Sequence, residues 1–124
     1  MKIYTSYFGN LEKIPKEIVP IAICLKLPKF YDGKVYQKIA PTAGILSRWK
    51  VNEDEEEYEV DYKRWVLDKH TQEEIYEEIK GLSEGKDVAL LCYEKPRDFC
   101  HRHLFAEWMK NKGYDVKEFE EQLL

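Results

Sequence analysis

The sequence lacks long hydrophobic runs, glycine-rich motifs and a large excess of either charge. Its apolar segments fall well short of the roughly 20 residues that cross a bilayer, so we expect no membrane partner. None of its six glycines belongs to a motif that cradles phosphate groups. The chain has 20 Lys and Arg and 24 Asp and Glu, which gives a formal net charge of −4. This charge argues against a protein that coats nucleic acid, although a local basic cleft is compatible with it.

Cysteine is also scarce. The chain has three cysteines, an odd number that does not suit a framework of disulfide bonds, and it has no apolar signal segment. Free thiols are typical of the reducing cytosol, so we expect a cytoplasmic protein. The length of 124 residues is enough for a hydrophobic core, and we expect residues 1–124 to form a single domain.

Short apolar segments predict the strands of a buried sheet. Residues 2–6 are rich in β-branched and aromatic side chains, and residues 20–27 and 88–91 have apolar cores without alternation. Strands of the second kind are covered on both faces, as in a parallel sheet. Residues 114–119 predict a last short strand, followed by a tail over residues 120–124.

Four stretches between and after these segments predict helices. Residues 41–50 group their apolar side chains on one side, and the acidic run 52–57 suits the first turn of a second helix. Thr71 and Glu74 form a capping box before a third helix, and a fourth begins near residue 99. We therefore expect a small three-layer α/β protein of Rossmann-like type, with a mostly parallel sheet of about four strands.

Three segments should meet at the carboxyl ends of the strands, where such sheets bind their ligands. They are residues 5–10, 26–36 and 92–102. The second belongs to a long connection, residues 28–40, for which a functional loop and a plain surface loop are equally open. The third is the richest in reactive side chains.

This third segment turns from a buried strand into a helix. We expect Asp98 to cap the helix, with Cys100 and His101 in its first turn. Free backbone amides and the helix dipole attract anions there and would lower the pKa of a thiol. Counting at about 100° per residue places His101 near the centre of the apolar face and His103 on the solvent side.

Three chemistries could use this junction. In the first, Arg97 and Arg102 bind an anion or a nucleotide, and Glu94 acts as a general base or nucleophile. In the second, Cys100 or Cys92 reacts as a thiolate. In the third, the two cysteines and a histidine bind a metal ion. Zinc sites usually pair cysteines about two to four residues apart, so the wider spacing here makes the metal site the weakest of the three.

Three strings carry a resemblance to known proteins: IYTSYFGN, VPIAICLKLPKFY and LLCYEKPRDFCHRHLFAEWM. Together they resemble the DUF488 family of small bacterial, archaeal and phage proteins, over essentially the whole chain. The most specific part is a Cys-x-Glu…Cys-His-Arg signature, matched here by Cys92, Glu94, Cys100, His101 and Arg102. The family name denotes an unknown function, so the resemblance implies a fold more than an activity.

Two N-terminal motifs of longer relatives are changed in this chain. The relatives tend to carry Thr-x-Gly-His-Ser after the first strand, where residues 5–8 read Thr-Ser-Tyr-Phe. They tend to carry Asp-Val-Arg after the second, where residues 24–26 read Cys-Leu-Lys. If the relatives' residues are catalytic, this protein would be a variant of the family, or Lys26 would supply the positive charge alone.

The leading hypothesis is an enzyme or binding protein for a phosphate-bearing ligand, such as a nucleotide or a nucleic-acid end. Glu94 would be the acid/base or nucleophile, and His101 would orient the reacting group. The predicted catalytic residues are Glu94, His101 and Cys100, and the predicted ligand-binding residues are Arg102, Arg97, Lys26, Thr5 and Ser6. We assign no metal ligand and no cofactor.

The competing hypothesis is a non-catalytic interaction module. Glu94, His101 and Arg102 would then bond one another and the backbone, and they would act as a structural lock at the turn from strand to helix. Thiol redox chemistry and a metal site are the remaining alternatives, and the oligomeric state is open.

Overall fold

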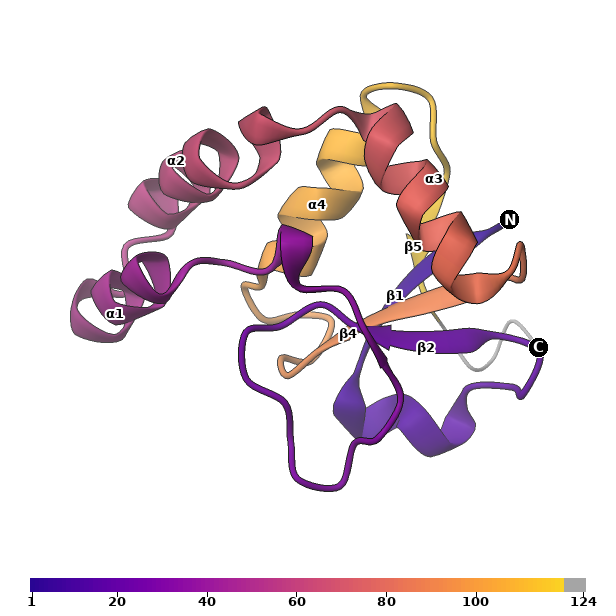
Figure 1. Ribbon diagram of the computed structural model, residues 1–124. Helices are drawn as coiled ribbons and strands as arrows, with labels where there is room; N and C mark the ends of the chain where they lie inside the picture. The colour runs from indigo at the N-terminus through magenta and orange to yellow at the C-terminus, as the bar shows by residue number, and fades with distance from the viewer. Residues whose placement is uncertain (120–124) are drawn as a thin grey trace.

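The computed structural model describes residues 1–119 and contains a five-stranded, all-parallel sheet in the order β3-β2-β4-β1-β5 (Figure 1). The strands are β1 (Ile3–Tyr7), β2 (Val19–Ala22), β3 (Lys34–Val35), β4 (Val88–Cys92) and β5 (Val116–Glu118). The expected Rossmann-like α/β fold is confirmed, with one strand more than the four expected. The addition is β3, whose two residues are too few to give a strand pattern in the connection 28–40.

Helices occupy most of the connections between these strands. The α-helices are α1 (Ala43–Asn52), α2 (Glu55–Trp65), α3 (Gln72–Ser83) and α4 (His101–Lys110). Three shorter 3-10 helices are η1 (Phe8–Lys13), η2 (Gln37–Ile39) and η3 (Leu67–Lys69). All four predicted helices are therefore present, in the predicted order.

Local hydrogen bonds explain where two of these helices begin. The Asp54 side chain accepts a hydrogen bond from the Glu57 amide, and α2 then carries acidic residues in its first turn. The Thr71 side chain accepts from the Glu74 amide, which confirms that half of the predicted capping box. The Glu74 carboxylate instead accepts a hydrogen bond from Lys38.

The start of α4 differs from the prediction. Asp98 does not cap this helix, because it lies two residues before the N-cap, in a turn that its amide closes by donating to the carbonyl of Lys95. Cys100 occupies the N-cap in an extended conformation, with φ −157° and ψ 144°. The helix therefore begins at His101, two residues later than predicted, and Cys100 lies just before its first turn.

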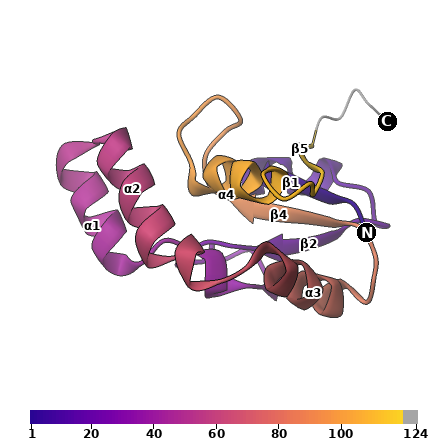
Figure 2. The ribbon, with the colours of Figure 1, turned by 90° about the horizontal axis from the view of Figure 1, so that it is seen from above.

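The direction of each connection explains which face of the sheet it covers. From β1 to β2 and on to β3 the chain moves toward one edge, and from β3 to β4 and on to β5 it moves toward the other. Right-handed crossovers then require the two sets of connections to lie on opposite faces. Figure 1 shows α3 and α4 above the sheet and η1 below it, and Figure 2 shows α1 and α2 together beyond the carboxyl ends of the strands.

The central strand β4 contributes to the hydrophobic clusters on both faces of the sheet. Val88 and Leu90 pack in the cluster that contains α3 and α4, whereas Ala89 and Leu91 pack in the cluster that contains η1. All five residues of β4 are buried. This double coverage is the reason why its sequence is apolar without alternation.

The C-terminal part of the described chain agrees with the prediction of a last strand, since β5 lies inside residues 114–119. The predicted tail, residues 120–124, lies outside the described residues. Within residues 1–119, no helix has the length and apolar character needed to span a membrane.

Replacing Tyr62 by Phe tests the contact that holds α2 against the rest of the protein. The buried Tyr62 hydroxyl donates to the carbonyl of Ile39 at 2.6 Å. Tyr62→Phe leaves that carbonyl without its donor, so we expect the free energy of unfolding to fall by about 1–3 kcal/mol in urea denaturation. Tyr4→Phe is the control, because the Tyr4 hydroxyl has no partner within residues 1–119. An equal loss of unfolding free energy in both variants would show that the hydrogen bond from Tyr62 to Ile39 does not stabilise the protein.

Candidate functional site

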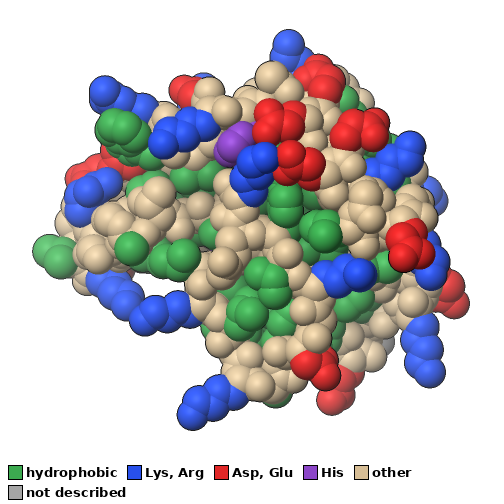
Figure 3. All heavy atoms as spheres, in the orientation of Figure 1, with side chains coloured by type: hydrophobic (Ala, Val, Ile, Leu, Met, Phe, Trp, Pro, Cys, Tyr) green, Lys and Arg blue, Asp and Glu red, His purple; other side chains and the backbone are tan. Residues whose placement is uncertain are grey.

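A cavity lies where the strand ends meet the α1–α2 pair. The chain leaves β1 and β2 toward one face of the sheet and leaves β4 toward the other, so a crevice opens near the carboxyl end of β4. The cavity there has a volume of about 230 Å³. Its lining comes from the residues after β2 and β4, the start of α4, one side of α1 and Tyr58 of α2. Figure 3 shows the molecule hollowed between the α1 region, at the left, and the main body.

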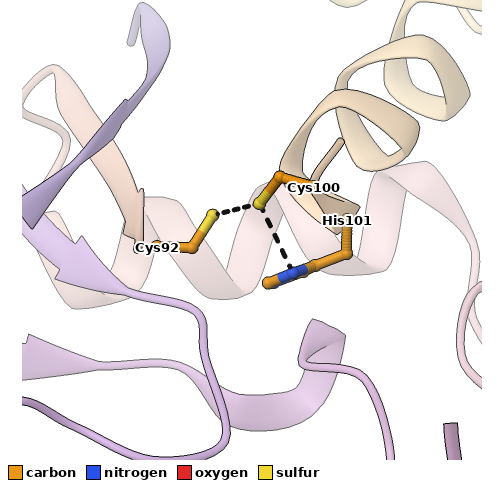
Figure 4. Close-up of side chains that lie close together, drawn as sticks. All are labelled: Cys92, Cys100 and His101. Atoms are coloured by element: carbon orange, nitrogen blue, oxygen red, sulfur yellow. Dashed lines mark hydrogen bonds between the residues drawn. The ribbon is translucent and has the colours of Figure 1, made fainter. Parts of the chain in front are cut away.

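Three buried residues that line this cavity lie close together: Cys92, Cys100 and His101. Figure 4 shows their side chains pointing toward one another. The sulfur of Cys92, at the end of β4, lies 2.7 Å from the sulfur of Cys100. The Cys100 sulfur lies 3.8 Å from Nδ1 of His101. The contact with Cys92 and burial raise the pKa of the Cys100 thiol, although we expected its place near the helix start to lower it.

The ring of His101 is held from its other nitrogen. Nε2 lies 2.7 Å from the carbonyl oxygen of Ile23, an atom that can only accept a hydrogen bond. Nε2 is therefore the donor, and in the neutral ring Nδ1 keeps its lone pair. Nδ1 is the ring nitrogen that faces Cys100.

Aromatic side chains from three elements form another part of the lining. Trp49 of α1 and Phe99 stack with their ring centroids 4.9 Å apart and an angle of 27° between planes. Tyr58 of α2 meets Phe99 edge-on at 4.9 Å. We call these three residues the aromatic cluster. Tyr58 is buried and the other two are half-buried, so the cluster forms an apolar wall of the cavity.

Three charged side chains also line the cavity: Lys26, Lys50 and Glu94. All three are exposed to solvent. Among residues 1–119, none of them forms a side-chain hydrogen bond or ion pair, so their charged groups are available to a ligand. Glu94 follows β4, and the two lysines come from the loop after β2 and from α1.

Hydrogen bonds hold the loop after β2 in place. The Tyr93 hydroxyl donates to the carbonyl of Lys26 at 2.7 Å, and the Cys24 thiol donates to the same carbonyl at 3.1 Å. The side-chain amide of Gln37 donates through Nε2 to the carbonyl of Leu25 at 2.8 Å. Burial raises the pKa of Cys24 to about 11, so this thiol stays neutral and acts as a packing group.

Arg102 does not line the cavity. Its side chain is completely buried, and Nη1 donates to the carbonyl of Glu94 at 2.6 Å and to the sulfur of Cys92 at 3.4 Å. Nε and Nη2 donate to the carboxylate of Glu118 at 3.1 and 3.0 Å. Burial disfavours the guanidinium charge, but Glu118 and Cys92 raise the pKa of Arg102 overall. All of these contacts are internal and join the start of α4 to the end of β4 and to Glu118.

The other predicted ligand-binding residues also lie apart from the cavity lining, except Lys26. Thr5 is buried within β1 and donates to Glu118 at 2.7 Å, and the buried Ser6 accepts a hydrogen bond from Asn10 at 3.3 Å. Both precede the end of β1 and therefore stay inside the sheet. Arg97 is exposed in the turn after β4.

All three predicted catalytic residues line the cavity. Glu94, Cys100 and His101 come from the end of β4 and the start of α4, and Lys26 joins them from the loop after β2. The fold thus brings together four of the eight predicted site residues, and they share one cavity.

The prediction that His103 faces solvent is wrong. Its side chain is half-buried, and its Nε2 is buried without a hydrogen-bond partner within residues 1–119. Burial and the charge of Arg102 lower the pKa of His103. The reason is the turn before α4, in which the carbonyls of Pro96 and Asp98 lie against the ring.

Sequence reasoning missed the aromatic cluster and Lys50. Trp49 and Tyr58 each belong to a separate series of apolar residues at helical spacing, and such a series predicts ordinary packing in the core. One feature of the element order could have indicated these residues. The crossover from β3 to β4 contains α1, α2 and α3, although one helix is enough to connect parallel strands. The two additional helices must therefore lie beyond the sheet, and here they cover the strand ends.

An all-parallel sheet with a cavity at the carboxyl end of its central strand is typical of ligand-binding Rossmann-like α/β proteins. Within this class, the family model DUF488-N3a, described as the active DUF488-N3 subclade, matches residues 10–113. The chain therefore belongs to the DUF488 family, as its signature indicated. No curated protein and no solved structure matches the chain.

Replacing Glu118 tests whether Arg102 has a structural role. Glu118→Ala leaves the buried guanidinium without its counter-charge, and breaking such a pair is strongly destabilising. We expect a loss of roughly 3 kcal/mol, at the low end of the range for buried pairs because Glu118 keeps 19% of its side-chain surface exposed. Urea denaturation would measure it.

Asp115→Ala provides a matched control on the same segment. Asp115 pairs with Lys117 at 3.6 Å, and both side chains are more than two-thirds exposed. An exposed pair of this kind contributes less than about 1 kcal/mol. If Glu118→Ala were no more destabilising than Asp115→Ala, the structural role of Arg102 would be refuted.

Proposed function

We propose that this protein is an enzyme that acts on a phosphate-bearing ligand with a flat ring, such as a nucleotide or the terminal nucleotide of a nucleic acid. The observation that carries the proposal is one cavity lined by the aromatic cluster and by a carboxylate and two lysines that have no partner within residues 1–119. The aromatic cluster would contact the ring, the two lysines would bind the phosphate, and the carboxylate would take part in the reaction. Its location at the carboxyl end of β4 agrees with the general position of ligand sites in this class of fold.

The aromatic cluster supports recognition of a ring. Stacking on an aromatic side chain contributes about 1–3 kcal/mol per nucleobase and tolerates any base, because every base has a flat face. At about 230 Å³ the cavity is smaller than the roughly 300–1,000 Å³ typical of ligand pockets. It therefore suits one base or a small part of a larger substrate, with the phosphate closer to solvent.

Lys26 and Lys50 support binding of the phosphate. Both line the cavity while their exposed ammonium groups lack partners among the described residues. We do not assign this role to Arg102, because its guanidinium already donates to the Cys92 sulfur, the Glu94 carbonyl and the Glu118 carboxylate. Charge from two flexible side chains takes the place of the missing glycine-rich phosphate loop.

Glu94 would carry the chemistry as an acid/base or nucleophile. The Arg102 guanidinium donates to the backbone carbonyl of Glu94, which fixes the position of the residue. The Glu94 side chain lines the cavity and has no partner in the described part of the chain. His101, held by the Ile23 carbonyl, would orient the reacting group. The description of the matching subclade as active supports an enzyme over a non-catalytic module.

The interaction-module hypothesis is supported by a different observation. Arg102, one of the five signature residues, is consumed by internal hydrogen bonds, as a structural lock requires. The side chains of Glu94, Lys26 and Lys50, by contrast, form no hydrogen bond or ion pair within residues 1–119. The signature therefore divides into a structural part and a part that faces the cavity, and the second part favours the enzyme.

Binding of adenosine 5′-monophosphate by the full chain, measured by calorimetry, tests the ligand-binding half of the proposal. We expect Lys26→Met or Lys50→Met to weaken binding about tenfold, the effect of losing roughly 1.4 kcal/mol from one charge-assisted contact. Lys29→Met is the matched control, because Lys29 is exposed close to Lys26 but does not line the cavity. Absence of binding, or equal effects of all three variants, would refute the proposal.

Glu94→Gln tests the catalytic half. We expect the free energy of unfolding of this variant to lie within about 0.5 kcal/mol of that of the original protein, because the carboxylate is exposed and has no partner among residues 1–119. It should abolish any conversion of short single-stranded oligonucleotides that the original protein performs, measured by mass spectrometry. A large loss of stability would assign Glu94 to the structural lock, and unchanged conversion would remove it from the chemistry.

A further inference from the structure

The two cysteines and the histidine beside the cavity have the composition of a metal site. The donor atoms of Cys92, Cys100 and His101 all lie within 4.8 Å of one another (Figure 4). All three residues are buried, and all three line the cavity. Sulfur and imidazole nitrogen are the ligands that zinc prefers in proteins.

The distances are close to those of a tetrahedral site. Zinc binds sulfur at about 2.3 Å and nitrogen at about 2.0–2.1 Å, so ligand atoms around it lie roughly 3.5–3.8 Å apart. The distance of 3.8 Å from the Cys100 sulfur to His101 Nδ1 already agrees. The two sulfurs, 2.7 Å apart, would have to separate by about 1 Å, a change within reach of side-chain torsion at one cysteine.

The surroundings of His101 prepare it as a ligand. Metal-bound histidines almost always donate their second ring N–H to a carbonyl or carboxylate, which fixes the tautomer and the direction of the ring. Here Nε2 donates to the Ile23 carbonyl at 2.7 Å, so the lone pair of Nδ1 is directed to the side of the ring on which Cys100 lies. The packing of Tyr62 against the ring, at 5.6 Å between centroids, supports the same orientation.

The charges are also compatible with a buried ion. Two thiolates balance the charge of a divalent cation, and burying a net neutral cluster avoids the large penalty of burying a free charge. Arg102 donates to the Cys92 sulfur at 3.4 Å, as an outer partner that stabilises a metal-bound thiolate would do. Glu118 compensates the charge of Arg102 independently.

We propose that Cys92, Cys100 and His101 bind one zinc ion, or a similar borderline-soft divalent cation, with a fourth position open to the cavity. Three protein ligands and one open position form the usual arrangement of a catalytic zinc, whereas structural sites have four protein ligands. The site does not depend on the proposed function, since the metal would bind without a nucleotide. A water molecule or a donor atom of the substrate would occupy the fourth position.

The spacing of the cysteines explains why the sequence favoured other chemistries. Residues 93–99 separate the two cysteines, beyond the spacing of common zinc motifs. The fold removes this separation, because the chain turns back after β4 and α4 begins beside the end of that strand. One ligand thus comes from a strand end and two from the start of a helix.

The experiment uses the full chain, purified under reducing conditions, loaded with zinc and dialysed without a chelator. Mass spectrometry of the metal content should give about one zinc per chain. We expect Cys92→Ser, Cys100→Ser and His101→Ala to reduce this content to near zero. Cys24→Ser is the matched control and should retain the zinc, because Cys24 lines the same cavity while its thiol binds the Lys26 carbonyl instead.

Cobalt spectroscopy of the unmodified protein keeps the proposal testable if a ligand variant fails to fold. Cobalt(II) should give the visible bands of a tetrahedral site and near-ultraviolet bands of two thiolates, and added zinc should remove both. Absence of zinc and cobalt binding would overturn the proposal. So would equal zinc loss in Cys24→Ser, or a metal-free chain lighter by two hydrogens after exposure to peroxide, which would identify Cys92 and Cys100 as a redox pair.

The two proposals fail separately. Zinc content is measured without any nucleotide, so loss of zinc in the ligand variants stands even if adenosine 5′-monophosphate does not bind. If the protein takes up no zinc after loading but still binds the nucleotide, the proposed function stands and the metal site alone is refuted.

Discussion

The buried guanidinium of Arg102 is the interaction on which the candidate site depends. A fully buried charge is strongly unfavourable unless it is paired and hydrogen-bonded. Arg102 meets this condition by binding the Glu94 carbonyl, the Cys92 sulfur and the Glu118 carboxylate, which also accepts from Thr5. The first turn of α4 is thereby joined to β4, to β5 and, through Glu118, to β1. Small displacements of α4 would break several of these bonds at once.

This arrangement explains how one signature serves both structure and function. Since the guanidinium fixes the start of α4 against the end of β4, the neighbouring Cys100 and His101 must lie beside Cys92. The same guanidinium holds the backbone of Glu94 but leaves its carboxylate unpaired within the described chain. Rigid backbone with an unengaged side chain is the combination that a reacting group requires.

The sequence predicted the fold well because the strands are apolar on both faces, a pattern that local composition reveals directly, as in β4. It also pointed to the region of the cavity, since the signature residues follow the central strand. It did not predict which of them face the cavity. Thr5 and Arg102 are polar and near the strand ends, yet their side chains turn inward to Glu118, a residue no local pattern connects with them. The aromatic cluster escaped prediction for the same reason.

The distribution of charge around the cavity suggests how such a site can be selective without a phosphate loop. A glycine-rich loop recognises phosphate by the fixed geometry of its backbone amides. Here the start of α4 is occupied by buried Cys100 and His101, so positive charge comes from the flexible side chains of Lys26 and Lys50. Flexible cations attract any phosphate and impose little geometry. If the protein binds the proposed ligand, selectivity would therefore depend on the rigid parts of the lining. The aromatic cluster would select a flat group, and the groups at the strand end would determine what lies within reach of Glu94.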